Sequence, residues 1–169
     1  WGYSDLTTIL NAIYAKTGQT GVLYQIRNVL YKERKQQMTD VRDVLCEGGD
    51  ALYRIDYHYV QGTEMHGIIV GGNIRCFLKL SGTAYMPDLN GKILLLESRS
   101  GTVARMETYL SQLQQIGAFE QIAGILLGTF TEMEAKQCMP DIVQLVKKYV
   151  RKTMPSRSRS DMGQMPKGL

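Results

Sequence analysis

The chain has 169 residues, of which 44% are hydrophobic and 21% charged, and its formal net charge is +4. These values are ordinary for a soluble globular protein, and the length is sufficient to bury one core. No apolar run approaches membrane-spanning length, and no basic segment followed by an apolar stretch opens the sequence. We therefore expect neither a signal peptide nor a membrane partner. The three cysteines are far apart and no two have metal-ligand spacing, which indicates free thiols in a reducing cytoplasm. We expect no metal and no cofactor.

The first segment predicts a turn, a helix and a short strand at 21–24. The apolar positions of the helix have the spacing of a single helical face and are Leu6, Ile9, Leu10, Ile13 and Tyr14. A serine on the turn that enters such a helix holds its hydroxyl near amide N–H groups and the positive end of the helix dipole. Ser4 is therefore a candidate nucleophile. In the alternative interpretation, Ser4 or Asp5 is an ordinary N-cap.

The next segment is charged and weakly periodic over residues 25–50, and we interpret 31–37 as a solvated helix or an interdomain linker. Residues 51–70 have the pattern of strands. His58 lies in an alternating stretch and His66 precedes a glycine turn. A lone histidine is most often a surface or hydrogen-bonded structural residue, so we assign a role to neither.

A motif-rich segment follows at residues 71–98. Gly71-Gly72-Asn73 predicts a tight glycine turn, residues 72–81 a helix, and 92–97 a strand. The apolar run Ile93–Leu96 is typical of a strand covered on both faces. Glu97 follows directly, at the carboxyl edge where sheets present site residues. The alternative is that Glu97 is merely the first polar residue of a surface loop.

The remaining elements complete an alternating pattern that predicts an α/β fold. We expect a helix that bears Val103, Met106, Leu110 and Leu113, a strand at 122–127, and a helix at 141–151 with Pro140 at its start. The glycine pairs at 71–72 and at 124 and 128 lack the spacing of phosphate loops, and we interpret them as turns.

The end of the chain carries the positive charge. From Lys147 onward there are seven basic residues and one acidic residue, whereas the rest of the chain has 13 basic and 15 acidic residues. A serine–arginine tail can bind nucleic acid, but no aromatic residue follows Tyr149 to stack on bases, so we expect no nucleic-acid partner. The alternation at 156–160 also argues against a buried strand.

Residues 71–98, together with 106–130, closely resemble the carboxyl-terminal domain of the LD-carboxypeptidases. These are metal-free serine peptidases of peptidoglycan recycling with a Ser–Glu–His triad, and the family includes the microcin C immunity peptidases. In this resemblance Glu97 falls on the triad glutamate, and residues 1–5 look like the Gly-Tyr-Ser-Asp nucleophile turn. The resemblance implies that Ser4 is the nucleophile and that the backbone N–H of Asp5 contributes to the oxyanion hole.

The resemblance fails at the third member of the triad. The alignment sets Gly163-Gln164 against the family's Gly-His, and a glutamine has no titratable nitrogen to accept the serine proton. The family's His-Gly-Pro turn is also missing near residues 24–26. Because Trp1 begins inside a motif, the start looks truncated, and the family has a preceding segment that holds a glycine-rich oxyanion loop. We therefore expect little or no peptidase activity.

These interpretations give a domain prediction and a function prediction. Residues 1–30 are the remnant of a nucleophile domain, 31–50 a linker, 51–154 the carboxyl-terminal domain, and 155–169 a degenerate or disordered basic tail. The expected function is removal of terminal D-alanine from murein tetrapeptides, with the murein peptide as partner and a possible homodimer. The alternatives are an immunity-type peptidase that cleaves aminoacyl- or peptidyl-nucleotides, and a non-catalytic muropeptide-binding remnant.

Overall fold

The computed structural model describes residues 1–31, 35–151 and 154–159. Its amino-terminal elements are α1 (Leu6–Thr17), the 3-10 helix η1 (Ile26–Leu30), α2 (Lys35–Arg42), the π-helix η3 (Asp43–Glu47) and the 3-10 helix η4 (Ala51–Tyr53). Then come β1 (Tyr57–Gln61), β2 (Ile69–Asn73), α3 (Ile74–Leu78), β3 (Ile93–Ser98), α4 (Val103–Gln115) and α5 (Ala118–Gln121). The last elements are β4 (Gly124–Phe130), α6 (Thr131–Ala135), α7 (Ile142–Lys147) and β5 (Ser156–Arg159).

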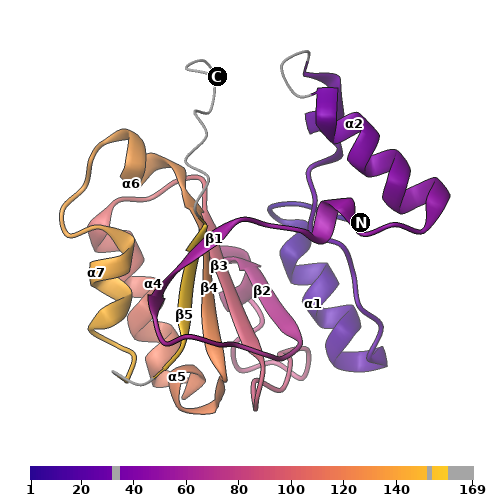
Figure 1. Ribbon diagram of the computed structural model, residues 1–169. Coiled ribbons are helices and arrows are strands. Elements are labelled where there is room, and N and C mark those ends of the chain that lie inside the picture. The colour runs from indigo at the N-terminus through magenta and orange to yellow at the C-terminus, as the bar shows by residue number, and fades with distance from the viewer. Residues whose placement is uncertain (32–34, 152–153, 160–169) are drawn as a thin grey trace.

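The five strands form one mixed sheet in the order β1-β5-β4-β3-β2. Strands β2, β3, β4 and β5 run parallel to one another, whereas β1 runs antiparallel to β5 at one edge. Helices α4 and α7 lie to one side of the sheet, and α1 lies beyond its other edge, next to β2 (Figure 1). The predicted α/β class is therefore confirmed.

The main core lies between the sheet and helices α4 and α7. Alternate residues of β3 and β4 point toward these helices, which bury their own apolar stripes against them. The side chains in this layer are almost inaccessible to solvent, and they include Leu94, Leu96, Met106, Leu110, Leu113, Ile125, Leu127 and Leu145. The predicted apolar stripe of α4 is thus a core stripe, as its period of 3.6 residues indicates.

Helix α1 is present as predicted, but its apolar stripe is only partly buried: Leu10 and Tyr14 are half-buried, and the other three residues are exposed. Leu6, Ile9 and Ile13 are 43%, 53% and 42% exposed, whereas the polar residues Thr7 and Asn11 are buried. The reason is that α1 covers the edge of β2, where backbone groups need hydrogen-bond partners. The Asn11 amide donates to the Gly71 carbonyl at 2.9 Å, and its oxygen accepts from the Gly71 N–H at 2.8 Å.

The glycine pairs at 71–72 and at 124 and 128 are not turns, and that prediction was wrong. Gly71 and Gly72 lie inside β2, and Gly124 and Gly128 lie inside β4. Gly71 and Gly72 have φ values of 104° and 129°, which L side chains rarely adopt. A Cβ on Gly72 would lie 2.9 Å from Oγ1 of Thr7, so glycine allows α1 to approach the strand closely.

The prediction that 156–160 cannot form a buried strand was also wrong for its described part. Residues 156–159 form β5, which lies between β1 and β4. Ser156 is only 3% exposed and pairs with Ile125, so its small side chain packs on the helical side of the sheet. Arg157 alternates to the opposite face. Residues 160–169, with Gln164 among them, lie outside the described residues.

Candidate functional site

The turn before α1 holds Ser4 in an unusual backbone conformation. Ser4 has a φ of 52°, in the left-handed region that residues other than glycine seldom occupy. The Leu6 N–H donates to the Tyr3 carbonyl and the Thr7 N–H donates to the Ser4 carbonyl. Gly2 bridges to Leu23, which gives the short strand predicted at 21–24 a single point of pairing. Such a strained strand-to-helix turn is typical of a presented nucleophile.

The side chain of Asp5 does not cap α1, although Asp5 occupies the N-cap position. Its Oδ1 accepts hydrogen bonds from Nη2 of Arg75 at 2.8 Å and from Sγ of Cys76 at 3.0 Å. The Cys76 hydrogen bond and the nearby Arg75 charge hold the pKa of Asp5 below its ordinary value. The Asp5 carboxylate therefore ties the Ser4 turn to α3 and leaves the first amides of α1 without a side-chain acceptor from this residue.

Glu97 lies near the carboxyl end of β3, where the pairing with β4 is irregular. Leu96 pairs with Leu127 and Ser98 with Phe130, so two residues of β4 oppose Glu97 alone. A bulge of this kind re-aims a side chain, and it is common beside active sites. A Cβ on Gly128 would lie 3.0 Å from Cβ of Glu97, so glycine at 128 leaves room for the glutamate.

The environment of Glu97 raises the pKa of its carboxyl group above the ordinary value. The cause is burial, which disfavours the ionised form, and a side-chain hydrogen bond from Asn73 opposes the shift. Asn73 is the residue paired with Glu97 across β2 and β3, and it is itself buried. A half-buried carboxylate with a fixed amide neighbour can orient a cationic base and stabilise its charge.

Contacts through Asn73 bring the Ser4 turn and Glu97 to the same corner of the sheet. The Asn73 N–H donates to Oγ1 of Thr7 at 3.2 Å, and Asn73 is the residue paired with Glu97 across β2 and β3. Burial and then the negative charge of Glu97 raise the pKa of the Tyr3 hydroxyl, so the residue before Ser4 lies within electrostatic reach of that carboxylate.

The two histidines of the chain do not join this corner. His58 lies on β1, three strands away from β3 in the sheet, and its side chain is exposed. His66 Nε2 lies 2.7 Å from Oε1 of Glu64, and the histidine side chain is 82% exposed. Both fit the surface role that is usual for a lone histidine, and neither is assigned to the site.

Sequence reasoning missed the residues that connect the two candidates. The sequence pattern predicts only that Asn73 ends a glycine turn and that Gly128 is a turn residue. Thr7 and Asn11 lie four residues apart on a helix and are both buried, at the border of the apolar stripe. Their spacing was a detectable signal, since two small polar residues on one helical face can bond to a strand edge.

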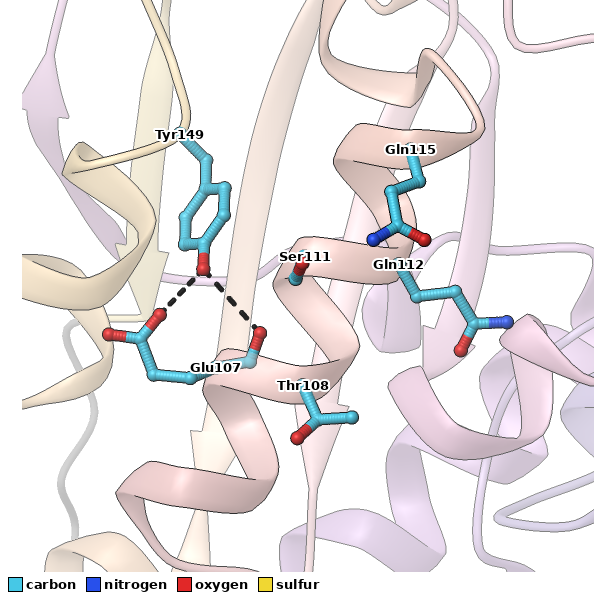
Figure 2. Close-up of a pocket in the computed structure, with 6 residues that line it drawn as sticks. All are labelled: Glu107, Thr108, Ser111, Gln112, Gln115 and Tyr149. Atoms are coloured by element: carbon cyan, nitrogen blue, oxygen red, sulfur yellow. Dashed lines mark hydrogen bonds between the residues drawn. The ribbon is translucent and has the colours of Figure 1, made fainter.

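A groove of about 620 Å³ lies apart from this corner, along α4 and Tyr149 (Figure 2). Its lining is polar, and the Tyr149 hydroxyl donates to Oε2 of Glu107 at 2.6 Å. It contains none of the candidate residues. Across the ranges that the structure describes, no three His, Cys, Asp or Glu side chains form a metal-binding group, and no helix has the length and apolarity needed to span a membrane.

The fold and the site define an α/β protein with a serine turn and a carboxylate at one corner of a mostly parallel sheet. The family model for the carboxyl-terminal domain of LD-carboxypeptidases matches residues 66–163, more than half of the chain. The chain therefore belongs to the LD-carboxypeptidase family, as the resemblance predicts. The match extends through β5 and beyond it.

Individual relatives agree with this assignment. A carboxypeptidase-type protein of Treponema pallidum is 30% identical over 153 residues, which cover 76% of this chain and 45% of the relative. A protein of Bacillus subtilis named for murein peptide carboxypeptidase activity is 28% identical over 140 residues, which cover 77% of this chain and 42% of the relative. This chain thus spans about half the length of the curated relatives it matches.

A solved structure shares the fold over nearly the whole chain. It is a Bacillus anthracis protein described as similar to MccF, the microcin C7 self-immunity protein. It superimposes with a TM-score of 0.72 at 25% identity and covers 94% of this chain and 56% of its own.

Proposed function

We propose that this chain forms part of a serine-type LD-carboxypeptidase that removes terminal D-alanine from murein tetrapeptides. The observation that carries the proposal is the position of Asn73, which donates to Thr7 next to the Ser4 turn and pairs with Glu97 across β2 and β3. The family assignment supports a carboxypeptidase, and one curated relative is named for murein peptides. The three free cysteines are in keeping with the reducing cytoplasm where such recycling would occur.

In the proposed reaction, Ser4 Oγ attacks the carbonyl carbon of the bond between the diamino acid and D-alanine. The serine proton passes to a base, and the carbonyl oxygen becomes an oxyanion that the Asp5 N–H can stabilise. The carbon–nitrogen bond then breaks, D-alanine leaves with the proton from the base, and an ester to Ser4 remains. Water hydrolyses this ester, and Glu97 holds the base in position during both steps.

Glutamine at position 164 leaves the proposed site without its expected base. Since a glutamine side chain cannot accept the serine proton, we expect hydrolysis to be slower than in a complete triad by a factor on the order of 10⁴. This chain would then retain the nucleophile and Glu97 while hydrolysing the substrate slowly or not at all.

Release of D-alanine from a murein tetrapeptide tests the proposal in three proteins: the unchanged chain, Gln164→His, and Gln164→His combined with Ser4→Ala. We expect the histidine variant to release D-alanine at least 100-fold faster than the unchanged chain, and the double variant to lose that gain. Equal rates in all three proteins would contradict the assignment of Ser4. Rapid release by the unchanged chain would contradict the role given to position 164.

The solved structure described as MccF-like favours a second candidate, an immunity-type peptidase that cleaves an aminoacyl- or peptidyl-nucleotide. The same assay separates the two candidates when a peptidyl-nucleotide replaces the tetrapeptide. A non-catalytic muropeptide-binding remnant is the third candidate. Calorimetric titration with the tetrapeptide detects it as binding without release of D-alanine.

A further inference from the structure

The pairing of β1 with β5 places the guanidinium group of Arg157 against the rings of Tyr57 and Tyr59. Tyr59 is opposite Arg157 in this antiparallel pair, and Tyr57 lies two residues earlier on the same face of β1. The Arg157 guanidinium carbon lies 4.2 Å from the ring centroid of Tyr57 and 4.0 Å from that of Tyr59. The two rings meet edge to face, 6.4 Å apart, so together they form a corner that holds the guanidinium.

The charge of Arg157 has no acidic partner in the described part of the chain. The ion pairs found there all involve other cations, and Nε of Arg157 is buried without a hydrogen-bond acceptor. Aromatic stacking occupies the faces of a guanidinium and leaves its edge available, where the two terminal Nη groups, unlike the buried Nε, can meet a ligand. Such a pre-oriented fork is suited to a planar group with two acceptor oxygens, which is the geometry of a carboxylate.

Arg157 also lies on the same face of the sheet as Glu97. Across the sheet Arg157 pairs with Leu126, and Leu126 pairs with Leu95, two residues before Glu97. We call these residues (Leu95, Glu97, Leu126 and Arg157) the open face, because all four are half-buried, in contrast to the helical side. Two strand spacings, about 10 Å, separate Arg157 from the β3 backbone. A short peptide can span that distance over the apolar floor of Leu95 and Leu126.

We propose that Arg157, Tyr57 and Tyr59 form a subsite for a free carboxylate of a peptide ligand that lies across the open face. This assignment deepens the proposed function, because murein tetrapeptides carry free carboxylates, and it rests on that function for the identity of the ligand. The tyrosines orient the guanidinium, and Arg157 supplies the charge and the two parallel donors.

Binding can be measured separately from hydrolysis, by calorimetric titration of the whole chain with N-acetyl-L-lysyl-D-alanine and with the same dipeptide as its carboxamide. We expect the acid to bind at least 10-fold more tightly than the amide. Arg157→Gln should weaken binding of the acid at least 10-fold and leave binding of the amide unchanged. Arg157→Lys, which keeps the charge but loses the fork, should fall between the two.

The matched control is Arg27→Gln, which removes the same charge from an exposed arginine that also lies over a tyrosine ring, that of Tyr31. It should bind the acid as the unchanged chain does, and circular dichroism should show that all variants are folded. Three results would each overturn the proposal. They are equal affinities for acid and amide, an Arg157→Gln variant that binds the acid as tightly as the unchanged chain, and no binding of the acid up to millimolar concentrations. Inorganic phosphate that displaces the acid with equal affinity would overturn the preference for a carboxylate. The titration measures binding and not hydrolysis. Its result can therefore be interpreted even if the D-alanine assay detects no activity.

Discussion

Helices α1 and α4 have similar amphipathic sequences but opposite relations to solvent. Helix α4 buries Met106, Leu110 and Leu113 completely against the sheet. Helix α1 leaves Leu6, Ile9 and Ile13 of its apolar stripe 42% to 53% exposed, and it buries Thr7 and Asn11. Figure 1 shows the cause, since α4 lies over the face of the sheet whereas α1 lies beside its edge strand.

This difference shows two structural roles that a helix can have. A helix on a sheet face gains stability from apolar area removed from water. A helix at a sheet edge satisfies backbone groups and fixes position, which requires polar side chains. Helix α1 belongs to the second kind, and the position it fixes is that of the Ser4 turn beside Glu97.

Truncation in the two apolar stripes should produce the largest difference. Leu110→Ala removes a fully buried side chain and should lower the free energy of unfolding by roughly 2–5 kcal/mol. Ile9→Ala, at a position that is 53% exposed, should change it by less than about 0.5 kcal/mol. Urea unfolding followed by circular dichroism measures both. Comparable losses in the two variants would mean that the α1 stripe is covered in solution.

Loss of the edge contact should have an intermediate effect. Asn11→Ala removes both hydrogen bonds to Gly71 and leaves that N–H and carbonyl without partners, at a cost of roughly 1–3 kcal/mol. Gln36→Ala breaks an exposed side-chain hydrogen bond to Asp40 and is the matched control, with almost no expected change. Hydrogen exchange should show faster exchange of the Gly71 amide in Asn11→Ala. Unchanged protection of that amide would argue against the bond.

The charge of Glu97 should have the smallest effect on stability, and it depends on pH. Burial raises the pKa of this carboxyl group in the folded state, so the folded protein holds the proton more tightly than the unfolded chain does. The bound proton therefore stabilises the folded protein at pH values below the pKa that Glu97 has in the unfolded chain. This stabilisation is lost as the pH rises through the higher pKa of Glu97 in the folded protein. Glu97→Gln should match the unchanged chain at low pH and exceed it at neutral pH.

Urea unfolding at several pH values measures this difference, and Glu120→Gln, at an exposed position, is the control that should show no such trend. A Glu97→Gln variant that is less stable than the unchanged chain at neutral pH would contradict the effect assigned to burial.

The sequence alone predicts the α/β class, the strand before Glu97 and the core stripe of α4, because each follows from a local hydrophobic pattern. The apolar run 93–96 predicts a strand covered on both faces, but Leu95 is only half-buried. Sequence reasoning fails for Gly71, Gly72 and Gly128, since glycine marks close backbone approach as well as turns, and only the tertiary structure shows which applies. It also fails at β5. The alternation of Ser156 and Arg157 satisfies the period of a strand, but the aromatic partners that accommodate the arginine lie about 100 residues earlier in the chain.

The candidate site shows the same division. The motif around Ser4 and the position of Glu97 are local features, so the sequence can propose both as candidates. Their connection depends on Asn73 and Thr7, whose contacts cross from β2 to α1 and have no local signature.

The most direct test of the central claim, that the Ser4 turn lies beside Glu97, is the titration of the Tyr3 hydroxyl by NMR of ¹³C-labelled tyrosine. Tyr3→Phe assigns the signal. We predict that Tyr3 in the unchanged chain has a pKa above its ordinary value of 10.0, and that Glu97→Gln lowers it, although not completely, because burial remains. The pKa of Tyr149, which a hydrogen bond to Glu107 raises, should not change in that variant. A Tyr3 pKa that is the same with and without the Glu97 charge would contradict the shared site.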